Sequence, residues 1–323
     1  MGFLKDGEWH DEWDYSDEES GAFERDDSIF RNWITPDGAP GPTGKGGFAA
    51  EPGRYRLYIS LACPWAHRAN IARHLKGLTG AIELVVVHWL MKDGGWSFRD
   101  GECVTPDPLL GAENLHQIYT KAKPDYSGHV TVPLLWDTKT DTIVNNESAD
   151  ILRMLGTAFD QCGANDLDLY PQPYREEIDA LNDKVYDAVN NGVYKAGFAA
   201  SQSAYDDAIE PLFAMLDELE QHLEAQEWLV GGQLTEADIR LWTTLIRFDP
   251  VYYVHFKCNV RRIADYPNLS AFTRRLYDVA GIAETVNFKH IRHHYFASHD
   301  FINPTGIVPA GPDPLIPGRP APD

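Results

Sequence analysis

The sequence predicts an α/β domain of strand–helix–strand, strand–strand–helix order, followed by an all-α helical domain. Two observations support the first part: alternating strand formers at residues 54–60 end where a helical pattern begins, and a second strand pattern follows at residues 82–89. Beyond residue 173, apolar residues recur every three to four positions. At 323 residues the chain exceeds one small core, so two domains with terminal segments are expected.

The four segments have the following expected boundaries. Residues 1–53 form an N-terminal arm, 54–160 the α/β domain, 174–300 the helical domain and 301–323 a C-terminal extension. The arm is acidic and then rich in Gly and Pro, so it is expected to be extended and docked by aromatic anchors. These anchors are Trp9, Trp13, Phe23, Phe30 and Trp33.

The order of elements within residues 54–160 is typical of the thioredoxin fold. Strands at 54–60 and 82–89 flank a helix at 64–78, which makes a right-handed βαβ unit. A polar insertion and a short helical stretch from Glu113 come next. Residues 130–137 and 142–144 then form a hairpin, and a helix covers 147–159. Pro133 stands where this fold places a cis-proline beside a reactive cysteine.

The helical domain follows a linker at residues 160–173. Its helices are expected at 174–197, 205–226, 235–248 and 267–280. Thr235 and Asp238 form a capping-box pattern at the start of the third helix. The Pro- and Gly-rich C-terminal extension is expected to lie extended on the surface.

Cys63 is the candidate nucleophile because it lies at the predicted strand-to-helix junction. Free N–H groups and the helix dipole favour a thiolate there, and Pro64 suits the first helical position. Ala66 occupies the place of a second redox cysteine, so an outside thiol must resolve any disulfide formed at Cys63. A buried structural cysteine is the alternative reading. His67 and Arg68 are as consistent with exposed positions as with a charge near the thiolate.

The amino-acid composition indicates which binding partners and which cellular compartment to expect. The net charge of −21, from 49 acidic and 28 basic residues, argues against nucleic acid and anionic membranes as partners. The sequence has no signal-like start and no run of eighteen apolar residues, and Cys103, Cys162 and Cys258 show no metal or disulfide spacing. We therefore expect a soluble cytoplasmic protein without a metal site.

A thioredoxin-like domain with one cysteine, followed by a helical domain, resembles the cytosolic glutathione transferases. Within them the chain is similar to the glutathionyl-hydroquinone reductases, the xi class, over roughly residues 30–310. The similarity is carried by seven motifs in order: CPWAHR at 63–68, WSF at 96–98, TVP at 131–133, NES at 146–148, RFD at 247–249, HFKCN at 255–259, and HY at 294–295 with INP at 302–304.

The resemblance implies a two-step reaction. Cys63 attacks the sulfur of a glutathionylated hydroquinone, releases the hydroquinone and keeps glutathione as a mixed disulfide. A second glutathione, or a related γ-glutamyl thiol such as γ-glutamylcysteine, then regenerates Cys63. The resemblance further implies a homodimer, with glutathione as cosubstrate and no metal.

The resemblance also implies the glutathione-binding residues. Val132 would pair its backbone with the cysteinyl part of the peptide, like an added strand. Glu147 and Ser148 open a helix, where they would hold the γ-glutamyl group. Trp96 would supply a flat wall and an indole donor. Alternatively, Glu147 and Ser148 would only cap a helix, and Trp96 would be a docked surface aromatic.

Three tyrosines would serve the hydroquinone. Tyr194, Tyr252 and Tyr295 match the family's tyrosines, whose hydroxyls would donate to the substrate oxygens and assist protonation of the ring. The family often has a second tyrosine after the His-Tyr pair, whereas this chain has Phe296. It is therefore open whether Tyr295 or the neighbouring position faces the substrate.

Two other functions compete with the reductase. An omega-like thioltransferase that reduces dehydroascorbate or protein mixed disulfides would use Cys63 equally well. A transferase-like interaction module without turnover would not need it. The tyrosines and the long terminal segments favour the reductase.

Overall fold

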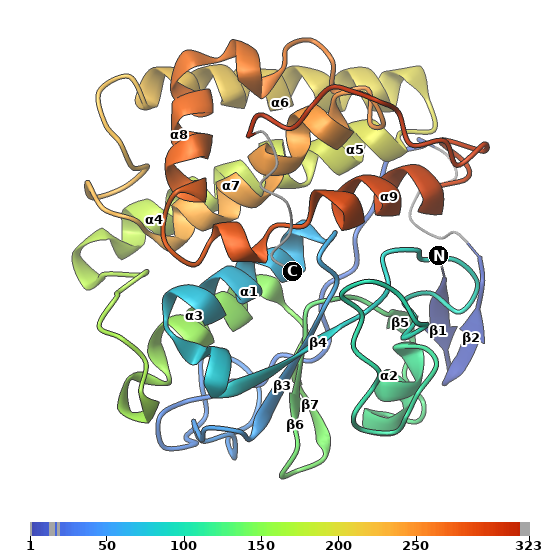
Figure 1. The fold of residues 1–323 in the computed structure, drawn as a ribbon, viewed down its shortest axis with the longest axis vertical. Coiled ribbons are helices and arrows are strands. Elements are labelled where there is room, and N and C mark those ends of the chain that lie inside the picture. The colour runs from blue at the N-terminus through green and yellow to red at the C-terminus, as the bar shows by residue number, and fades with distance from the viewer. Residues whose placement is uncertain (1, 13–16, 18–19, 317–323) are drawn as a thin grey trace. The chain divides into compact units, whose positions relative to one another are not determined.

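The computed structural model describes residues 2–12, 17 and 20–316, so Trp13 lies outside the described residues. The chain divides into two compact units (Figure 1). We call Met1–Asp14 with Asp26–Leu167 the sheet unit, and Tyr15–Arg25 with Asp168–Asp323 the helical unit. In the described part of the chain, no helix is long and apolar enough to cross a membrane.

The sheet unit is built on a mixed four-stranded sheet of order β4-β3-β6-β7. Strand β3 (Tyr55–Ile59) runs parallel to β4 (Ile82–Val86) and antiparallel to β6 (Leu134–Asp137), which pairs antiparallel with β7 (Thr142–Asn145). The parallel pair follows from the crossover helix and the antiparallel pair from the hairpin turn. This confirms the predicted thioredoxin-like order, although β4 ends three residues early, at Val86.

Three helices complete the sheet unit. Helix α1 (Pro64–Leu75) is the crossover between β3 and β4, and it packs against α3 (Ser148–Thr157). Helix α2 (His116–Ala122) is the short helix predicted after the polar insertion. Residues Leu57 and Leu135, paired across the sheet, are both fully buried, as expected for central strands that are covered on both faces.

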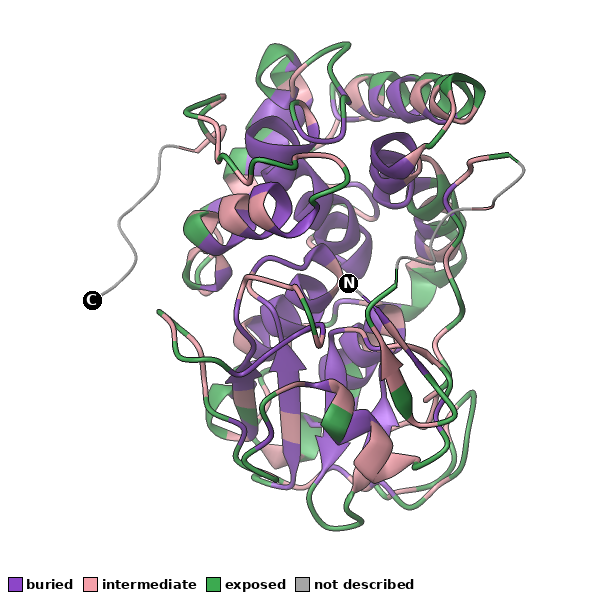
Figure 2. Cartoon of the chain, turned by 90° about the vertical axis from the view of Figure 1, so that its right-hand side faces the viewer, coloured by how far each residue is buried: buried purple, intermediate pink, exposed green. Residues whose placement is uncertain are grey.

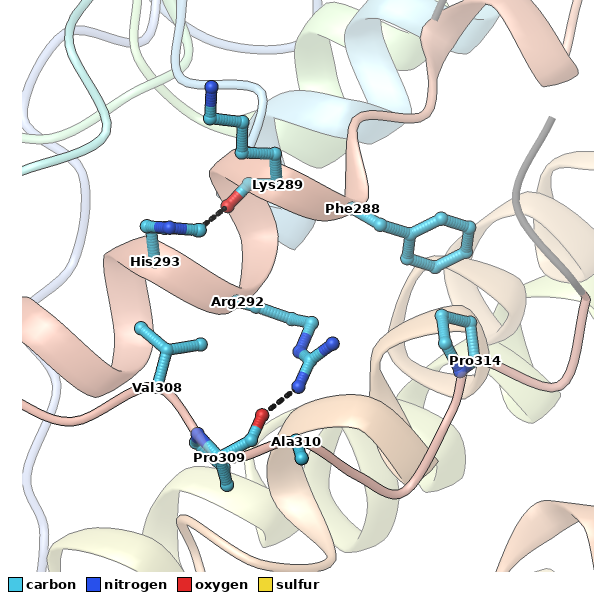
Figure 3. Close-up of a pocket in the computed structure, with 8 residues that line it drawn as sticks. All are labelled: Phe288, Lys289, Arg292, His293, Val308, Pro309, Ala310 and Pro314. Atoms are coloured by element: carbon cyan, nitrogen blue, oxygen red, sulfur yellow. Dashed lines mark hydrogen bonds between the residues drawn. The ribbon is translucent and has the colours of Figure 1, made fainter. Parts of the chain in front are cut away.

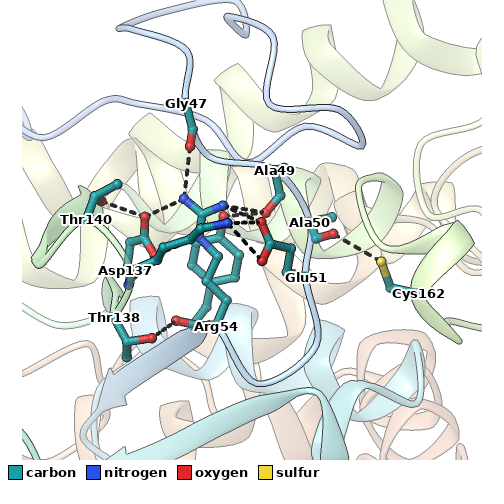
Figure 4. Close-up of polar contacts among 11 residues, drawn as sticks. Gly47, Ala49, Ala50, Glu51, Arg54, Asp137, Thr138, Thr140 and Cys162 are labelled. Atoms are coloured by element: carbon teal, nitrogen blue, oxygen red, sulfur yellow. Dashed lines mark hydrogen bonds and ion pairs between the residues drawn. The ribbon is translucent and has the colours of Figure 1, made fainter.

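A buried ion pair fixes the ends of β3 and β6 (Figure 4). Arg54 donates from Nε to Asp137 at 2.7 Å and from a terminal nitrogen at 2.6 Å, and the Asp137 side chain is fully buried. Burial acts to raise the pKa of Asp137, but hydrogen bonds from Arg54 and Thr140 outweigh it and hold the pKa below its ordinary value. Arg54 also binds the Gly47 carbonyl and Glu51, so it joins the arm to the sheet.

The arm begins with a small sheet that the sequence analysis did not predict. Strands β1 (Phe3–Lys5) and β2 (Glu8–His10) form a hairpin, and β1 also pairs with β5 (Gly128–His129). Asp6 and Gly7 turn the hairpin with φ of 50° and 81°, the left-handed region that Gly and Asp tolerate.

The helical unit contains α7 (Glu236–Arg247), which is buried along its whole length. The other helices of this unit are α4 (Arg175–Val185), α5 (Gly192–Phe198), α6 (Gln202–His222), α8 (Pro267–Tyr277) and α9 (Phe288–Ser298). Figure 2 shows that buried residues gather on the inward sides of the helices. Helix α9 was not among the predicted helices. Two π-helical turns, η4 (Tyr186–Asn190) and η5 (Phe248–Tyr252), interrupt the regular helices, so residues 174–197 are not one continuous α-helix as predicted.

The predicted capping box starts α7. The Thr235 backbone N–H and hydroxyl both donate to one Asp238 oxygen, at 2.7 and 2.9 Å, and the Leu229 N–H donates to the other at 2.8 Å. Burial nevertheless raises the pKa of Asp238 to about 6.

Candidate active site

Cys63 is the N-cap residue of α1, as its strand-to-helix position predicts. Its Sγ lies 3.5 Å from the Ala66 backbone nitrogen and accepts a hydrogen bond from it. The residue is 9% exposed, so burial alone does not separate a nucleophile from a structural cysteine. Cys258 differs from Cys63 in being fully buried, and this burial raises the pKa of the Cys258 thiol. Cys63 alone of the four free cysteines caps a helix of the described chain.

Val132 lies directly beside Cys63. The Val132 carbonyl oxygen is 3.5 Å from Sγ, and the Val132-Pro133 peptide bond is cis, as the fold predicts. The Val132 backbone N–H finds no acceptor among the described residues. An extended peptide placed alongside could therefore pair with this segment next to the thiol.

Glu147 and Ser148 form the N-terminus of α3. The Glu147 carboxylate accepts from the Ala149 N–H at 3.0 Å and from the Ser28 hydroxyl at 3.1 Å, so it acts as a helix cap. Ser148 is the first residue of the helix and is 3% exposed. The capping role and a role in ligand binding are compatible, because a helix N-terminus offers several N–H donors.

Arg68 joins the Cys63 helix to the α3 terminus, and sequence reasoning did not include it in the site. Its guanidinium donates to the Ser148 hydroxyl at 3.4 Å and lies 4.5 Å from the centre of the Trp65 ring. The side chain is buried, with 1% of the residue exposed, and His67 is also buried. The alternative that these two residues are exposed is therefore wrong, since both side chains are buried.

Trp96, the fourth predicted glutathione residue, lies in the loop between β4 and α2. It is 6% exposed, so it is not a docked surface aromatic. Its carbonyl accepts from the Leu115 N–H at 2.8 Å, which ties the loop to the start of α2.

The three predicted tyrosines meet in the helical unit. Tyr295 of α9 shares hydrogen bonds with the hydroxyls of Tyr194 of α5, at 2.6 Å, and Tyr252 of η5, at 3.0 Å. Burial raises the pKa of Tyr252 and Tyr295 well above the ordinary tyrosine value, so both remain neutral phenols. Their hydroxyls can donate hydrogen bonds over the whole physiological pH range.

The Phe296 side chain packs against other residues than the Tyr295 side chain does. Its ring packs edge-on against His255, with centroids 4.8 Å apart, whereas the Tyr295 hydroxyl is at the centre of the tyrosine cluster. Tyr295 is thus the α9 residue that this cluster contains.

Two residues of the arm contact the tyrosine cluster, and the sequence analysis did not place either of them there. The Phe23 ring stacks on Tyr194 at 6.2 Å, and the Arg25 guanidinium lies 5.3 Å from the centre of the same Tyr194 ring. Arg25 also donates to Asn191 at 3.1 Å. Phe23 was predicted only as an aromatic anchor, and no local pattern marked Arg25.

Comparison with known proteins agrees with the architecture. Models of the glutathione S-transferase N-terminal and C-terminal domains match residues 62–158 and 202–275. The fold and the two matches define the chain as a member of the glutathione transferase superfamily.

Individual relatives narrow the assignment. Glutathionyl-hydroquinone reductase YqjG of Escherichia coli (strain K12) is 59% identical, over 97% of this chain and 95% of that protein. Its glutathione-bound structure superimposes with a TM-score of 0.90 at 56% identity, covering 98% of each chain. Glutathionyl-hydroquinone reductase PcpF of Sphingobium chlorophenolicum is 50% identical over 98% of each chain. The Xi glutathione S-transferase of Phanerochaete chrysosporium has a TM-score of 0.88 at 52% identity, covering 93% of this chain and 96% of that one.

The chain therefore belongs to the glutathionyl-hydroquinone reductase family, the xi class of glutathione transferases.

Proposed function

We propose that the protein reduces glutathionylated hydroquinones to hydroquinones, with glutathione as the reductant. The observation that carries this proposal is the position of Cys63: its thiol caps α1 beside the Val132 carbonyl, and the Val132 N–H finds no acceptor among the described residues. Two relatives of at least 50% identity over nearly their whole length are named glutathionyl-hydroquinone reductases. The first is also known as a glutathione-bound structure.

In the first step the Cys63 thiolate attacks the thioether sulfur of the conjugate. A Cys63–glutathione disulfide bond forms as the bond from sulfur to the ring carbon breaks. The electron pair of that bond stays on the ring carbon, which takes up a proton, so the ring is reduced while the two sulfurs are oxidised.

In the second step a glutathione thiolate attacks the glutathione sulfur of the mixed disulfide. Oxidised glutathione leaves, and the Cys63 thiolate is restored. An outside thiol is required because Ala66 cannot supply a second cysteine. The same cradle would accept γ-glutamylcysteine, which keeps the γ-glutamyl and cysteinyl parts.

The proposed glutathione site comprises Val132, Glu147, Ser148 and Trp96. Val132 would pair with the cysteinyl backbone and set the sulfur beside Cys63. Glu147 and Ser148 would hold the ammonium and carboxylate of the γ-glutamyl group. Trp96 would close one side of the site.

The tyrosine cluster would hold the hydroquinone and its proton supply. Because Tyr252 and Tyr295 stay neutral, their hydroxyls can donate to the ring oxygens as charge develops there. An omega-like thioltransferase would not need this cluster, and we keep that activity as the alternative. We further propose a homodimer in the reducing cytoplasm, where the four free cysteines would persist.

The decisive experiment is turnover of glutathionyl-menadiol by Cys63→Ser. Loss of the nucleophile should lower the rate by roughly 10³ or more, while glutathione binding persists. Cys162→Ser is the matched control, because that thiol donates to the Ala50 carbonyl and does not cap the N-terminus of α1. More than a tenth of wild-type turnover in the Cys63 variant would reject the mechanism.

Adduct mapping tests the choice of thiol independently. After exposure to oxidised glutathione, mass spectrometry should find one glutathione on Cys63. First modification of the exposed Cys103 would contradict the assignment.

A further inference from the structure

A second concave site lies in the helical unit, between α9 and the C-terminal extension (Figure 3). Its volume of about 490 Å³ lies within the range of roughly 300–1,000 Å³ that is usual for small-molecule sites. The lining comes from the first turns of α9 and from the extension: Phe288, Lys289, Arg292, His293, Val308, Pro309, Ala310 and Pro314. None of these residues belongs to the tyrosine cluster, and none has a role in the reaction proposed above.

The charge of this lining is opposite to that of the chain. The whole protein carries −21, yet the lining holds two permanent cations, one histidine and no acidic residue. Asp313 lies in the same extension but is exposed and does not line the pocket. The Lys289 ammonium points away from the pocket in Figure 3, so Arg292 supplies the positive charge inside it, and a concave surface with that charge favours anions.

Arg292 reaches into the middle of the pocket (Figure 3). One terminal nitrogen of its guanidinium donates to the Pro309 carbonyl. Among the described residues, the buried Nε atom has no hydrogen-bond partner and no carboxylate pairs with the guanidinium. A buried donor left unpaired destabilises a protein, so an acceptor at this point is favoured.

The other walls are flat and apolar. In Figure 3 the Phe288 and Pro314 rings lie to one side of the Arg292 guanidinium and Val308 lies on the other side, and Ala310 continues the apolar lining. An inorganic anion would leave these surfaces uncovered, whereas an aromatic ring would bury them while its anionic group meets Arg292.

We propose that this pocket binds a small aromatic carboxylate, with the carboxylate on Arg292 and the ring against Phe288 and Pro314. The carboxylate accepts from the guanidinium in the geometry that such pairs favour, and the ring displaces water from the apolar walls. Binding at this pocket requires neither Cys63 nor glutathione.

The test uses 2-naphthoate as the probe and isothermal titration calorimetry on the full chain. Arg292→Gln should weaken binding about tenfold or more, because it removes the charge and the fork of donors. Arg275→Gln is the matched control: Arg275 is also half-buried, donates to the Glu227 carbonyl at 2.7 Å and lies near the Trp228 ring, but it is outside the pocket. Binding by Arg292→Gln within twofold of wild type would overturn the proposal.

Two further probes separate the parts of the ligand. The neutral isostere 2-naphthalenemethanol should bind at least tenfold more weakly than 2-naphthoate, and acetate should give no measurable heat. Equal affinity for the neutral compound would show that Arg292 does not bind the carboxylate, and it would overturn the proposal. If Arg292→Gln fails to fold, Arg292→Lys replaces it, and it should still weaken binding because one ammonium cannot reproduce the planar fork.

A shortened chain tests a different occupant. Ending the chain at residue 316 should leave the affinity for 2-naphthoate unchanged. A tenfold gain would assign the pocket to residues 317–323 and overturn the proposal for a small molecule.

Discussion

Tyr295→Phe is the most informative single change in the tyrosine cluster. The Tyr295 hydroxyl takes part in both hydrogen bonds of the cluster, at 2.6 Å to Tyr194 and 3.0 Å to Tyr252. Removing it breaks both of these bonds, whereas Tyr194→Phe and Tyr252→Phe each leave one of them in place. At about 1 kcal/mol per buried hydrogen bond, Tyr295→Phe should lower the free energy of unfolding by about 2 kcal/mol.

The kinetic effect of Tyr295→Phe should depend on the substrate. Loss of a proton donor or polar contact lowers kcat by about 10 to 10³. Turnover of glutathionyl-menadiol by Tyr295→Phe should fall within that range, while reduction of a small disulfide barely changes, because it needs no ring proton. The pH profile should show no tyrosine ionisation up to about pH 9, since burial raises the pKa of Tyr252 and Tyr295 well above the ordinary value.

The assay compares both substrates across wild type, the three variants and a control. Tyr205→Phe is that control, because it also loses one tyrosine hydrogen bond in the helical unit, the 2.8 Å bond to the Lys257 carbonyl. If both activities fall together in every cluster variant, the tyrosines are structural. That result would favour a general thioltransferase activity over the reductase mechanism.

Three further variants test the framework around the site. Arg54→Met should lower the free energy of unfolding by about 3–5 kcal/mol in urea, because it leaves the buried Asp137 carboxylate unpaired; an unchanged midpoint would contradict this. Arg68→Met should raise the KM for glutathione about tenfold while kcat stays within a few fold, because Ser148 loses the hydrogen bond that Arg68 donates to its hydroxyl. A change in kcat alone would count against this role of Arg68. Burial raises the pKa of Asp238 to about 6, above the ordinary unfolded value of about 3.9. The carboxyl therefore contributes stability below that lower value and loses it as pH rises through 6. The stability of wild type relative to Asp238→Asn should thus increase by about 1 kcal/mol from pH 8 to pH 5, and a constant difference would refute the shift.

The parts of the site that could be predicted from sequence lie at the ends of regular elements. Cys63 stands where a strand pattern gives way to a helix, and Glu147 and Ser148 stand where the next helix begins. Such junctions are set by local spacing, so the sequence alone locates them. The strand formers of β3 and the helical period beyond residue 173 are likewise local patterns.

The residues that sequence reasoning missed depend on distant partners. Arg68 is polar and follows a helix start, which is equally consistent with solvent; only its contacts with Trp65 and Ser148 show why it is buried. Arg25 lies in an acidic arm, and its role arises from Tyr194, far along the chain. Helix α9 contains three histidines, one lysine and one arginine, so its apolar period is weak until the tyrosine cluster is known.

The π-helical turn η5 makes the spacing of residues before Tyr252 as important as their identity. A π turn contains one more residue than an α-helical turn would need, and Pro250 within it lacks the N–H that a regular helix would use. Deleting one residue from this turn would shift every later residue by one position, which is about 100° around the helix axis. Tyr252 would then face away from Tyr295 although every functional side chain was still present. A change of length in this short segment should therefore disturb the tyrosine cluster more than a substitution that keeps the length.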